Sequence, residues 1–223
     1  MIKPVAPARR ARRRLRTPNP EIETRLLKAA YDLIRERGFP ELRVDEITDR
    51  AGLSVGTFYL YFEGKDDLFT RLVIEHTAAL RARCQQAAAG SGSVLERLTR
   101  SLVAYIDFVL ENERGFLYFR NSGSVRTTVG NLSSWAFEQH AQDLRPLLEE
   151  GMKRGELEMQ DPVLLTQSIL GAMQHLAGFW LENKASYDRE QITSFLVHIG
   201  ALLTRPRSAG AREGGTVGKK RRA

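Results

Sequence analysis

The segment from Val44 to Phe62, with the lysine that follows it, carries the residues best suited to contact another molecule. Thr57 offers a hydroxyl and a methyl group, which suit either a base edge or a phosphate. Tyr59 and Tyr61 offer phenol hydroxyls that can bond to phosphate oxygens. Lys65 opens the next predicted helix, where an ammonium group and free backbone N–H groups can bind a phosphate together. These residue types favour contact with a nucleic acid.

Such side chains need a short helix that stands out from its neighbour and is held across a tight turn. The sequence predicts helices at 44–51 and 55–61, joined by a turn at residues 52–54. Gly52 can adopt a left-handed conformation after a helix, and Ser54 can cap the next one. Phe58 and Phe62 are four residues apart, so both are expected to point inward. The residues then expected to face outward are Val55, Gly56, Thr57, Tyr59 and Leu60, with Tyr61 at the edge.

The string from Val44 to Leu68, VDEITDRAGLSVGTFYLYFEGKDDL, resembles the TetR family of transcriptional repressors. The specific part is Gly-Thr-Phe-Tyr-x-Tyr-Phe with a lysine three residues later. This motif-level resemblance covers about residues 20–70, and beyond Leu68 it extends only to the number and order of helices. The resemblance implies a DNA-binding helix-turn-helix. It places Val55, Gly56 and Thr57 nearest the bases and Tyr59, Tyr61 and Lys65 at phosphates.

Two positions depart from the usual pattern of the family. Arg43 stands where a capping serine or threonine is common, and we expect it to contact the DNA backbone itself. Thr48 stands where alanine is common, and we expect slightly looser packing there. Arg43 and Ser54 complete the predicted set of DNA-contacting residues.

The rest of the body is also predicted to be helical, because alternating strand patterns and internal repeats are absent. Caps, glycines and prolines predict helices at about 20–37, 65–88, 94–111, 116–121, 132–153, 162–183 and 189–204. The expected fold class is all-α: an N-terminal three-helix helix-turn-helix domain followed by a larger helical domain for ligand binding and dimerisation. The predicted divisions are a disordered basic arm (1–18), the DNA-binding domain (19–68), the effector-binding and dimerisation domain (69–204) and a disordered basic tail (205–223).

The positive net charge of +7 is concentrated at the two ends of the chain. Residues 1–18 carry seven basic side chains and no acidic one, and residues 205–223 carry a net charge of +6. The body, 19–204, is therefore at −6. Flexible basic segments attract polyanions without sequence preference. A role in solubility or localisation is the alternative.

The predicted DNA-binding domain is itself acidic, with seven basic and eleven acidic side chains between Asn19 and Leu68. Either its few cations face the DNA or the basic arms supply the attraction. We therefore expect residues 9–16 of the N-terminal arm to enter the adjacent minor groove or to lie along phosphates.

Helix-turn-helix repressors usually bind palindromic operators as symmetric dimers. The resemblance implies that the last two helices of each subunit form the homodimer interface, and their sequence suits this. Residues 163–181 are apolar on nearly every face and include small residues that allow close helix approach. The last helix has a wide apolar stripe. An ordinary monomer core is the alternative.

The resemblance also implies that the middle helices bind a small-molecule effector. The candidate lining residues are Tyr105, Phe108, Phe119, Trp135, Phe137, Met173, His175, Phe179 and Trp180. For each of them, a position in the core without any ligand contact is the favoured alternative. No cluster of carboxylates converges on this region by spacing, which argues for a neutral, largely apolar effector, lipid-like or aromatic.

Other classes of function fit the sequence less well. An enzyme is disfavoured because no nucleophile elbow, phosphate loop or paired catalytic acids occur. The four histidines lack metal spacing, no cofactor is expected, and Cys84 is expected to be inert. No segment has the pattern of a signal peptide, and the most apolar stretch, 163–181, is too polar for a membrane span, so we expect a cytoplasmic protein. A nonspecific nucleic-acid binder acting through its tails is the remaining alternative. The effector, the operator, the regulated genes, the direction of regulation and the role of the C-terminal tail stay open.

Overall fold

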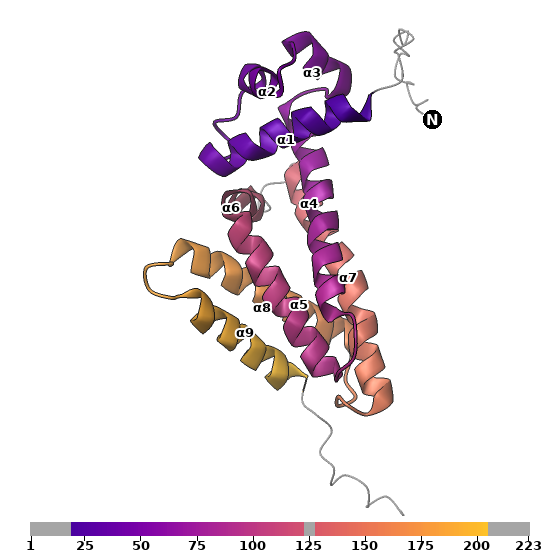
Figure 1. The fold of residues 1–223 in the computed structure, drawn as a ribbon. Helices are drawn as coiled ribbons and strands as arrows, with labels where there is room; N and C mark the ends of the chain where they lie inside the picture. The colour runs from indigo at the N-terminus through magenta and orange to yellow at the C-terminus, as the bar shows by residue number, and fades with distance from the viewer. Residues whose placement is uncertain (1–18, 123–127, 205–223) are drawn as a thin grey trace, which may run out of the picture. The chain divides into compact units, whose positions relative to one another are not determined.

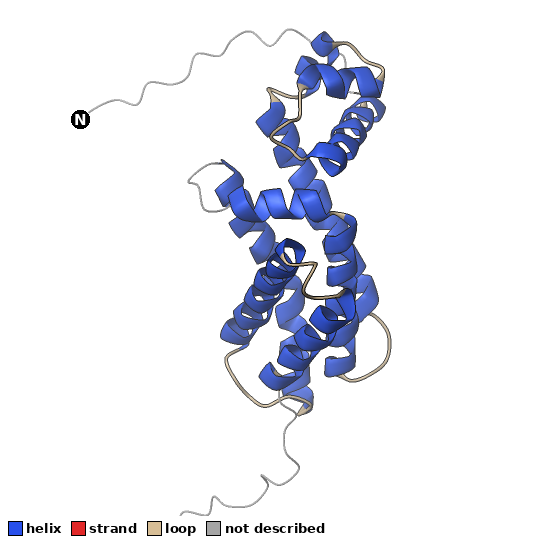
Figure 2. Ribbon diagram, turned by 90° about the vertical axis from the view of Figure 1, so that its left-hand side faces the viewer, coloured by secondary structure: helices blue, strands red, loops and turns tan. Residues whose placement is uncertain are grey.

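The computed structural model describes residues 19–122 and 128–204, with side chains given except for those of 118–131. Over these ranges the chain forms nine helices and no strand (Figure 1; Figure 2). The predicted all-α fold is therefore confirmed. The two predicted basic arms lie outside the described residues.

The chain divides into two compact units, Met1–Leu72 and Val73–Ala223. The first holds α1 (Pro20–Arg37), α2 (Val44–Ala51), α3 (Val55–Tyr61) and the start of α4 (Lys65–Ala88). The second holds the rest of α4 with α5 (Val94–Glu111), α6 (Glu113–Ser122), α7 (Thr128–Arg154), α8 (Pro162–Glu182) and α9 (Arg189–Leu203). The division falls within α4, and the predicted boundary after residue 68 stays a prediction.

The first unit begins with a capped helix and is held by a small apolar core. The Asn19 side chain accepts a hydrogen bond from the backbone N–H of Glu21, and Pro20 occupies the first turn of α1. Gly38 ends the helix with a φ of 88°. The side chains buried between the helices include Leu26, Ala30, Ile47, Phe58, Phe62 and Leu68. Burying apolar side chains of this size is the main stabilising term for such a unit.

In the second unit, three helices start at the caps that the sequence predicts. Ser93 and Glu96 form a reciprocal capping box at the start of α5, and Asp188 and Gln191 form another at α9. The Asp161 carboxylate accepts from the first free N–H groups of α8. Helices α5, α7, α8 and α9 pack on one another around a shared apolar core, which includes Leu98, Ile106, Leu148, Ile169 and Trp180.

Two helices are longer than the sequence indicates. Helix α6 runs over Glu113–Ser122 and α7 over Thr128–Arg154, whereas we expected 116–121 and 132–153. The extra turns are polar and lack the apolar spacing on which the expectation rested. Only Asn112, which caps the end of α5, separates the two helices, so the start of α6 has no cap residue of its own.

Two arginines hold the connection between α4 and α5. The Arg100 guanidinium donates to the carbonyls of Ala87 and Ser91 at 2.9 and 3.2 Å. The Arg97 guanidinium donates to the carbonyl of Ala88 at 3.0 Å and to the Glu150 carboxylate of α7 at 3.0 and 3.1 Å. These bonds satisfy carbonyls that the end of a helix leaves free. The segment 89–92 between the two helices is therefore fastened to its neighbours.

Candidate nucleic-acid interface

A tight turn joins α2 to α3. Gly52 ends α2 in the left-handed conformation, with φ 64° and ψ 42°, as the sequence predicts. The next N–H group, that of Leu53, donates back to the carbonyl of Thr48 at 2.9 Å. Ser54 caps α3, because its hydroxyl accepts from the backbone N–H of Thr57 at 3.1 Å. The turn therefore fixes the direction in which α3 leaves α2.

Helix α3 has a buried and an exposed side. Phe58 is fully buried and Phe62 nearly so, and their rings lie 5.4 Å apart. Tyr59 and Leu60 are each 57% exposed, and Val55 is also exposed. The predicted outward orientation is confirmed for Val55, Gly56, Tyr59 and Leu60, whereas Thr57 is half-buried. The outward face presents one phenol hydroxyl and a strip of apolar atoms to another molecule.

Gly56 lies on the exposed side of α3 with free space around it. A Cβ atom built there would meet only the Ser54 hydroxyl oxygen, at an ordinary contact distance of 3.7 Å. The fold therefore does not need glycine at this position. A close approach of the helix backbone to a ligand is a physical reason for its presence.

Two of the polar side chains on α3 already have partners. The hydroxyls of Ser54 and Thr57 lie 2.9 Å apart and share a hydrogen bond. The Tyr61 hydroxyl accepts from the backbone N–H of Asn19 at 3.0 Å, which joins the end of α3 to the start of α1. Residues 1–18 therefore connect to the described chain beside the last turn of α3.

Lys65 begins α4 as predicted, and its ammonium group lies against the chain. The Nζ atom is 5.0 Å from the centre of the Phe39 ring and donates to the carbonyl of Pro40 at 3.4 Å. Both contacts are weak for an ammonium group. The side chain can therefore leave them for a stronger anionic partner, such as a phosphate.

Most arginines in the described part of the first unit, residues 19–72, have partners within it. Arg25 donates to the carbonyl of Ala51 at 2.5 Å, and Arg37 pairs with Glu46 at 2.9 Å. Arg50 donates twice to Glu36, at 2.5 and 2.9 Å, which lowers the pKa of that carboxyl below its ordinary value. Arg25 and Arg50 thus fasten α2 to α1. Sequence reasoning missed both roles, because these partners lie 26 and 14 residues away.

The two departures from the family pattern have structural consequences. Arg43 precedes α2 without capping it and instead donates twice to Asp45, at 3.1 and 2.6 Å, which lowers the pKa of the Asp45 carboxyl. Thr48 is fully buried, and its hydroxyl donates to the carbonyls of Val44 and Asp45. Its polar atom is therefore satisfied within α2 itself.

The predicted effector residues do not lie in one place. Tyr105 is buried with its ring edge against Phe116, and burial raises the pKa of its phenol. Phe108 contacts the ring of His76, whose pKa is lowered by burial. His175, Phe179 and Trp135 lie at the surface, Phe137 is half-buried and Trp180 is buried. The side chain of Phe119 lies outside the described residues.

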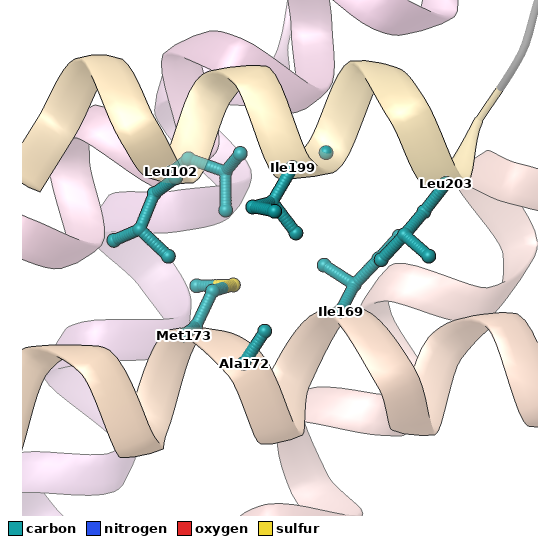
Figure 3. Close-up of a pocket in the computed structure, with 8 residues that line it drawn as sticks. Leu102, Ile169, Ala172, Met173, Ile199 and Leu203 are labelled. Carbon is teal, nitrogen blue, oxygen red and sulfur yellow. The ribbon is translucent and has the colours of Figure 1, made fainter.

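An apolar crevice lies between α5, α8 and α9 (Figure 3). It has no space for a whole water molecule. Its lining residues are Leu102, Ile169, Ala172, Met173, Leu196, Ile199, Gly200 and Leu203. Met173 is the predicted effector residue among them. No polar side chain lines this crevice, so it can accommodate only an apolar group, and only if the helices separate.

The turn, the capped short helix and its exposed face define a DNA-binding helix-turn-helix protein. Residues 26–72 match the bacterial regulatory proteins of the tetR family, and residues 91–201 match the tetracyclin repressor-like C-terminal domain. The chain belongs to the TetR family of transcriptional regulators. It is a DNA-binding regulator and not an enzyme.

Several relatives resemble the chain along most of its length. The transcriptional activator FasR of Mycolicibacterium smegmatis is 26% identical over 185 residues, which cover 82% of this chain and 83% of FasR. The fatty acid metabolism regulator protein of Bacillus subtilis is 23% identical over 180 residues, covering 78% and 91% of the two chains. The crystal structure of FadR from Bacillus subtilis in complex with stearoyl-CoA has a similar fold, with a TM-score of 0.69, 21% identity and coverage of 81% and 97%.

Two further observations concern membranes and metals. Among the residues that the structure describes, no helix is both long and apolar enough to span a lipid bilayer. Within the same residues, no three His, Cys, Asp or Glu side chains gather into a group that could hold a metal ion.

Burial raises the pKa of the Cys84 thiol to about 11, which keeps it protonated and unreactive at neutral pH.

Proposed function

We propose that this regulator is a ligand-responsive repressor that binds a palindromic operator as a homodimer and is released by a small, largely apolar effector. The observation that carries the proposal is the exposed face of α3, with Tyr59 and Leu60 each 57% exposed beside the bare backbone at Gly56. Val55, Gly56 and Thr57 lie nearest the bases, and Tyr59, Tyr61 and Lys65 hold phosphates. Ser54 and Arg43 complete the contact. The site of action is the cytoplasm, where bacterial DNA lies.

The arginine contacts within the first unit support a role for the N-terminal arm. Arg37, Arg43 and Arg50 are paired with carboxylates, so their charges are largely neutralised. The chain enters α1 at Asn19, which is bonded to Tyr61 at the end of α3. An arm that begins there is well placed to reach DNA contacted by α3, and residues 9–16 supply its charge.

The homodimer is supported by the surface of α8 and α9. Apolar side chains remain exposed there, including Leu164, Phe195 and Leu202. A second copy of the same surface would cover them in a symmetric interface. Dimerisation would also place two recognition helices about one DNA turn apart, roughly 34 Å.

Two observations support an apolar effector. Relatives along most of the chain include a regulator of fatty acid metabolism, and a structure with the same fold is a complex with stearoyl-CoA. The crevice between α5, α8 and α9 is lined by apolar side chains alone. We propose that an acyl chain is the apolar part of the effector, and that Tyr105, Phe108 and Met173, which belong to or pack against the core of the second unit, are its candidate contacts.

The proposed mechanism is a two-state change. Helix α4 begins with the phosphate-binding Lys65, and its later part is tied to α7 by the Arg81–Asp143 pair, with N–O distances of 2.5 and 2.8 Å. Effector binding among these helices would shift α4 and change the separation of the recognition helices, which weakens both half-sites at once. One of the relatives, FasR, is an activator, so the direction of regulation needs a transcription readout.

The test is fluorescence anisotropy of the full chain on DNA from upstream of its own gene, with excess unrelated competitor. We expect Tyr59→Ala and Lys65→Ala each to weaken specific binding by at least tenfold. Tyr59→Phe removes only the hydroxyl and should have part of the Tyr59→Ala effect. Lys153→Ala, an exposed lysine of α7, is the matched control and should bind as the unchanged protein does.

The same assay separates the alternatives. If competitor removes all binding from every genomic fragment tried, the protein acts as a nonspecific binder and the proposal fails. Stearoyl-CoA and free stearate are then added to the operator complex as effector probes. Operator affinity that stays constant at a saturating concentration would exclude that compound as the effector. A promoter–reporter assay with and without the protein distinguishes repression from activation.

A further inference from the structure

Helix α3 lacks the side chains that most often read base pairs. Its sequence, VGTFYLY, contains no Asp, Glu, Lys, Arg, Asn, Gln or His. Arginine and lysine commonly bind guanine, asparagine and glutamine bind adenine, and acidic side chains accept a hydrogen bond from cytosine. The helix that the fold presents to DNA therefore cannot form any of these pairs.

The hydroxyl groups of this region are largely engaged within the chain. Those of Ser54 and Thr57 share a hydrogen bond of 2.9 Å, and the Tyr61 hydroxyl accepts from the backbone N–H of Asn19. Tyr59 carries the remaining hydroxyl of α3, which we assign to a phosphate. Hydrogen bonding therefore leaves α3 few means of distinguishing one base from another.

Two aliphatic side chains are exposed on the outward face instead. Leu60 is 57% exposed and Val55 43%. At about 100° per residue, these two positions lie about 140° apart around the helix axis. Tyr59 and Gly56 lie between them, and the fully buried Phe58 lies on the other side. The outward face therefore has an aliphatic side chain at each edge and exposed backbone at Gly56 between them.

This face is more apolar than a helix surface in water requires. Val55, Tyr59 and Leu60 are exposed large hydrophobic residues and make up three of the seven residues of α3. Helix α1 of the same unit instead exposes charged side chains, such as Lys28 and Arg35. Single exposed apolar residues are common on proteins, but three on one short helix indicate a partner with apolar groups.

Thymine is the base whose edge in the major groove offers an apolar group. Its C5 methyl group lies in the groove that admits an α-helix, where guanine, adenine and cytosine present hydrogen-bond donors and acceptors. An aliphatic side chain that covers such a donor or acceptor removes it from water without replacing the hydrogen bond, which is costly. Val55 and Leu60 therefore favour thymine over the other bases at the positions that they cover.

We propose that Val55 and Leu60 determine operator specificity by packing against thymine methyl groups in the major groove. This inference rests on the proposed function, in which α3 of each subunit contacts one half-site of a palindromic operator. Leu60 thereby joins the DNA-contacting residues, to which the sequence motif did not assign it. Each half-site then contains thymine at the positions that the two side chains cover.

The N-terminal arm cannot produce the same preference. In the minor groove, A·T and T·A pairs present the same acceptors, and the thymine methyl group lies in the major groove. Replacing thymine by uracil removes this methyl group and leaves the hydrogen-bonding groups of both grooves unchanged. Sensitivity to the replacement therefore reports on α3 and not on residues 9–16.

The experiment uses operator duplexes in which deoxyuridine replaces thymidine at one position of each half-site at a time. Fluorescence anisotropy measures binding of the full chain at a fixed salt concentration with excess unrelated competitor. Each duplex lacks two methyl groups, and burial of one methyl group corresponds to roughly fourfold in affinity. We expect at least one position at which the replacement weakens binding on the order of tenfold.

Variants assign each methyl group to a side chain. Leu60→Ala should reduce the effect of uracil to less than threefold at the thymine that Leu60 covers, and Val55→Ala should do the same at its own thymine. Met159→Ala truncates an apolar side chain that is 74% exposed between α7 and α8, and this control should keep the full response. Circular dichroism should show equal helix content in all variants, because the three side chains are exposed.

The outcomes separate this inference from the proposed function. Specific operator binding that is insensitive to every uracil replacement overturns the inference and leaves the proposed function intact. An equal effect of uracil in the unchanged protein, Leu60→Ala and Val55→Ala also overturns it, because the methyl group then acts through the DNA itself. The absence of any specifically bound operator overturns the proposed function, and the inference with it.

Discussion

The outward face of α3 depends on a few residues with different tasks. Phe58 anchors the helix in the core, and the Ser54 hydroxyl holds its first turn. Tyr59 projects into solvent on the opposite side, without a tertiary role that the described side chains reveal. Gly56 has no side chain, so the helix backbone is exposed at that position. Loss of function without loss of stability is therefore expected at Tyr59 and Gly56 and not at Phe58.

The Gly56→Ala substitution separates folding from DNA binding. The added methyl group meets only the Ser54 hydroxyl oxygen at 3.7 Å, and alanine is the better helix former by about 0.5–1 kcal/mol. We expect the melting temperature to stay equal or rise, while affinity for the operator falls at least tenfold, because the methyl group keeps α3 away from the groove. Thermal denaturation and anisotropy of one preparation check both parts. Unchanged operator affinity would show that the backbone at Gly56 does not approach DNA closely.

At the residue scale, the sequence predicts the orientation of a side chain when its contacts lie within a few positions along the chain. The four-residue spacing of Phe58 and Phe62 is sufficient to set the inward face, and hence the exposure of Tyr59. The partners of Arg25 and Arg50 were not predictable, because each joins residues from different helices. Nothing in local spacing distinguishes such an arginine from one that contacts DNA.

At the scale of the helices, capping residues and side-chain hydrogen bonds explain where the elements start and end. Asn19, Ser93, Asp161 and Asp188 accept hydrogen bonds from the first turns, as their types and positions predict. The starts of α6 and α7 were predicted less well. Helix α6 starts directly after Asn112, the C-cap of α5, so no break in the sequence separates the two helices, and polar residues extend α7 beyond its apolar stripe. Pattern-based prediction fails where the helix backbone continues without an apolar face.

The end of α4 offers a prediction about element stability. The Arg97 side chain is only 22% exposed and bonds to the Ala88 carbonyl and to Glu150, whereas the Arg83 side chain is 36% exposed and pairs with Glu111, itself 56% exposed. Arg97→Ala leaves a half-buried carboxylate and a carbonyl without this partner, which costs about 1–3 kcal/mol. Arg83→Ala, the matched control, should cost less than about 1 kcal/mol.

Urea denaturation followed by circular dichroism gives the two unfolding free energies, and hydrogen exchange locates the change. Amide protection should fall at the end of α4 and in residues 89–92 for Arg97→Ala alone. Equal losses for both variants would mean that burial does not distinguish these two ion pairs.

For the whole molecule, charge is divided between segments with different tasks. The body between the arms is at −6, although it contains the DNA-binding unit. Within that unit, Arg37, Arg43 and Arg50 are paired with carboxylates that neutralise them. We therefore expect a polyanion to be attracted mainly by the ends of the chain, while the proposed contacts of α3 provide shape and specificity. The charge division follows from the sequence, and the ion pairs emerge only from the structure.

Deletion of residues 1–16 is the last prediction and tests this division of tasks. It removes seven positive charges next to the N-terminal end of α1, which is bonded to the last turn of α3. We expect weaker operator binding and a shallower salt dependence, with the slope falling by about 0.9 for every phosphate that the arm neutralises in the full chain. Anisotropy titrations between about 50 and 200 mM salt measure both quantities.

Deletion of residues 205–223 is the control, because it removes a net charge of +6 from a tail that continues from α9 rather than from α1. If attraction depends on where the arm begins, only the N-terminal deletion lowers the slope for the operator. If both deletions lower it equally, the ends act merely as diffuse positive charge, and the minor-groove position of residues 9–16 is wrong. If neither changes it, the cations of the helix-turn-helix unit must exchange their internal carboxylates for phosphates when DNA binds.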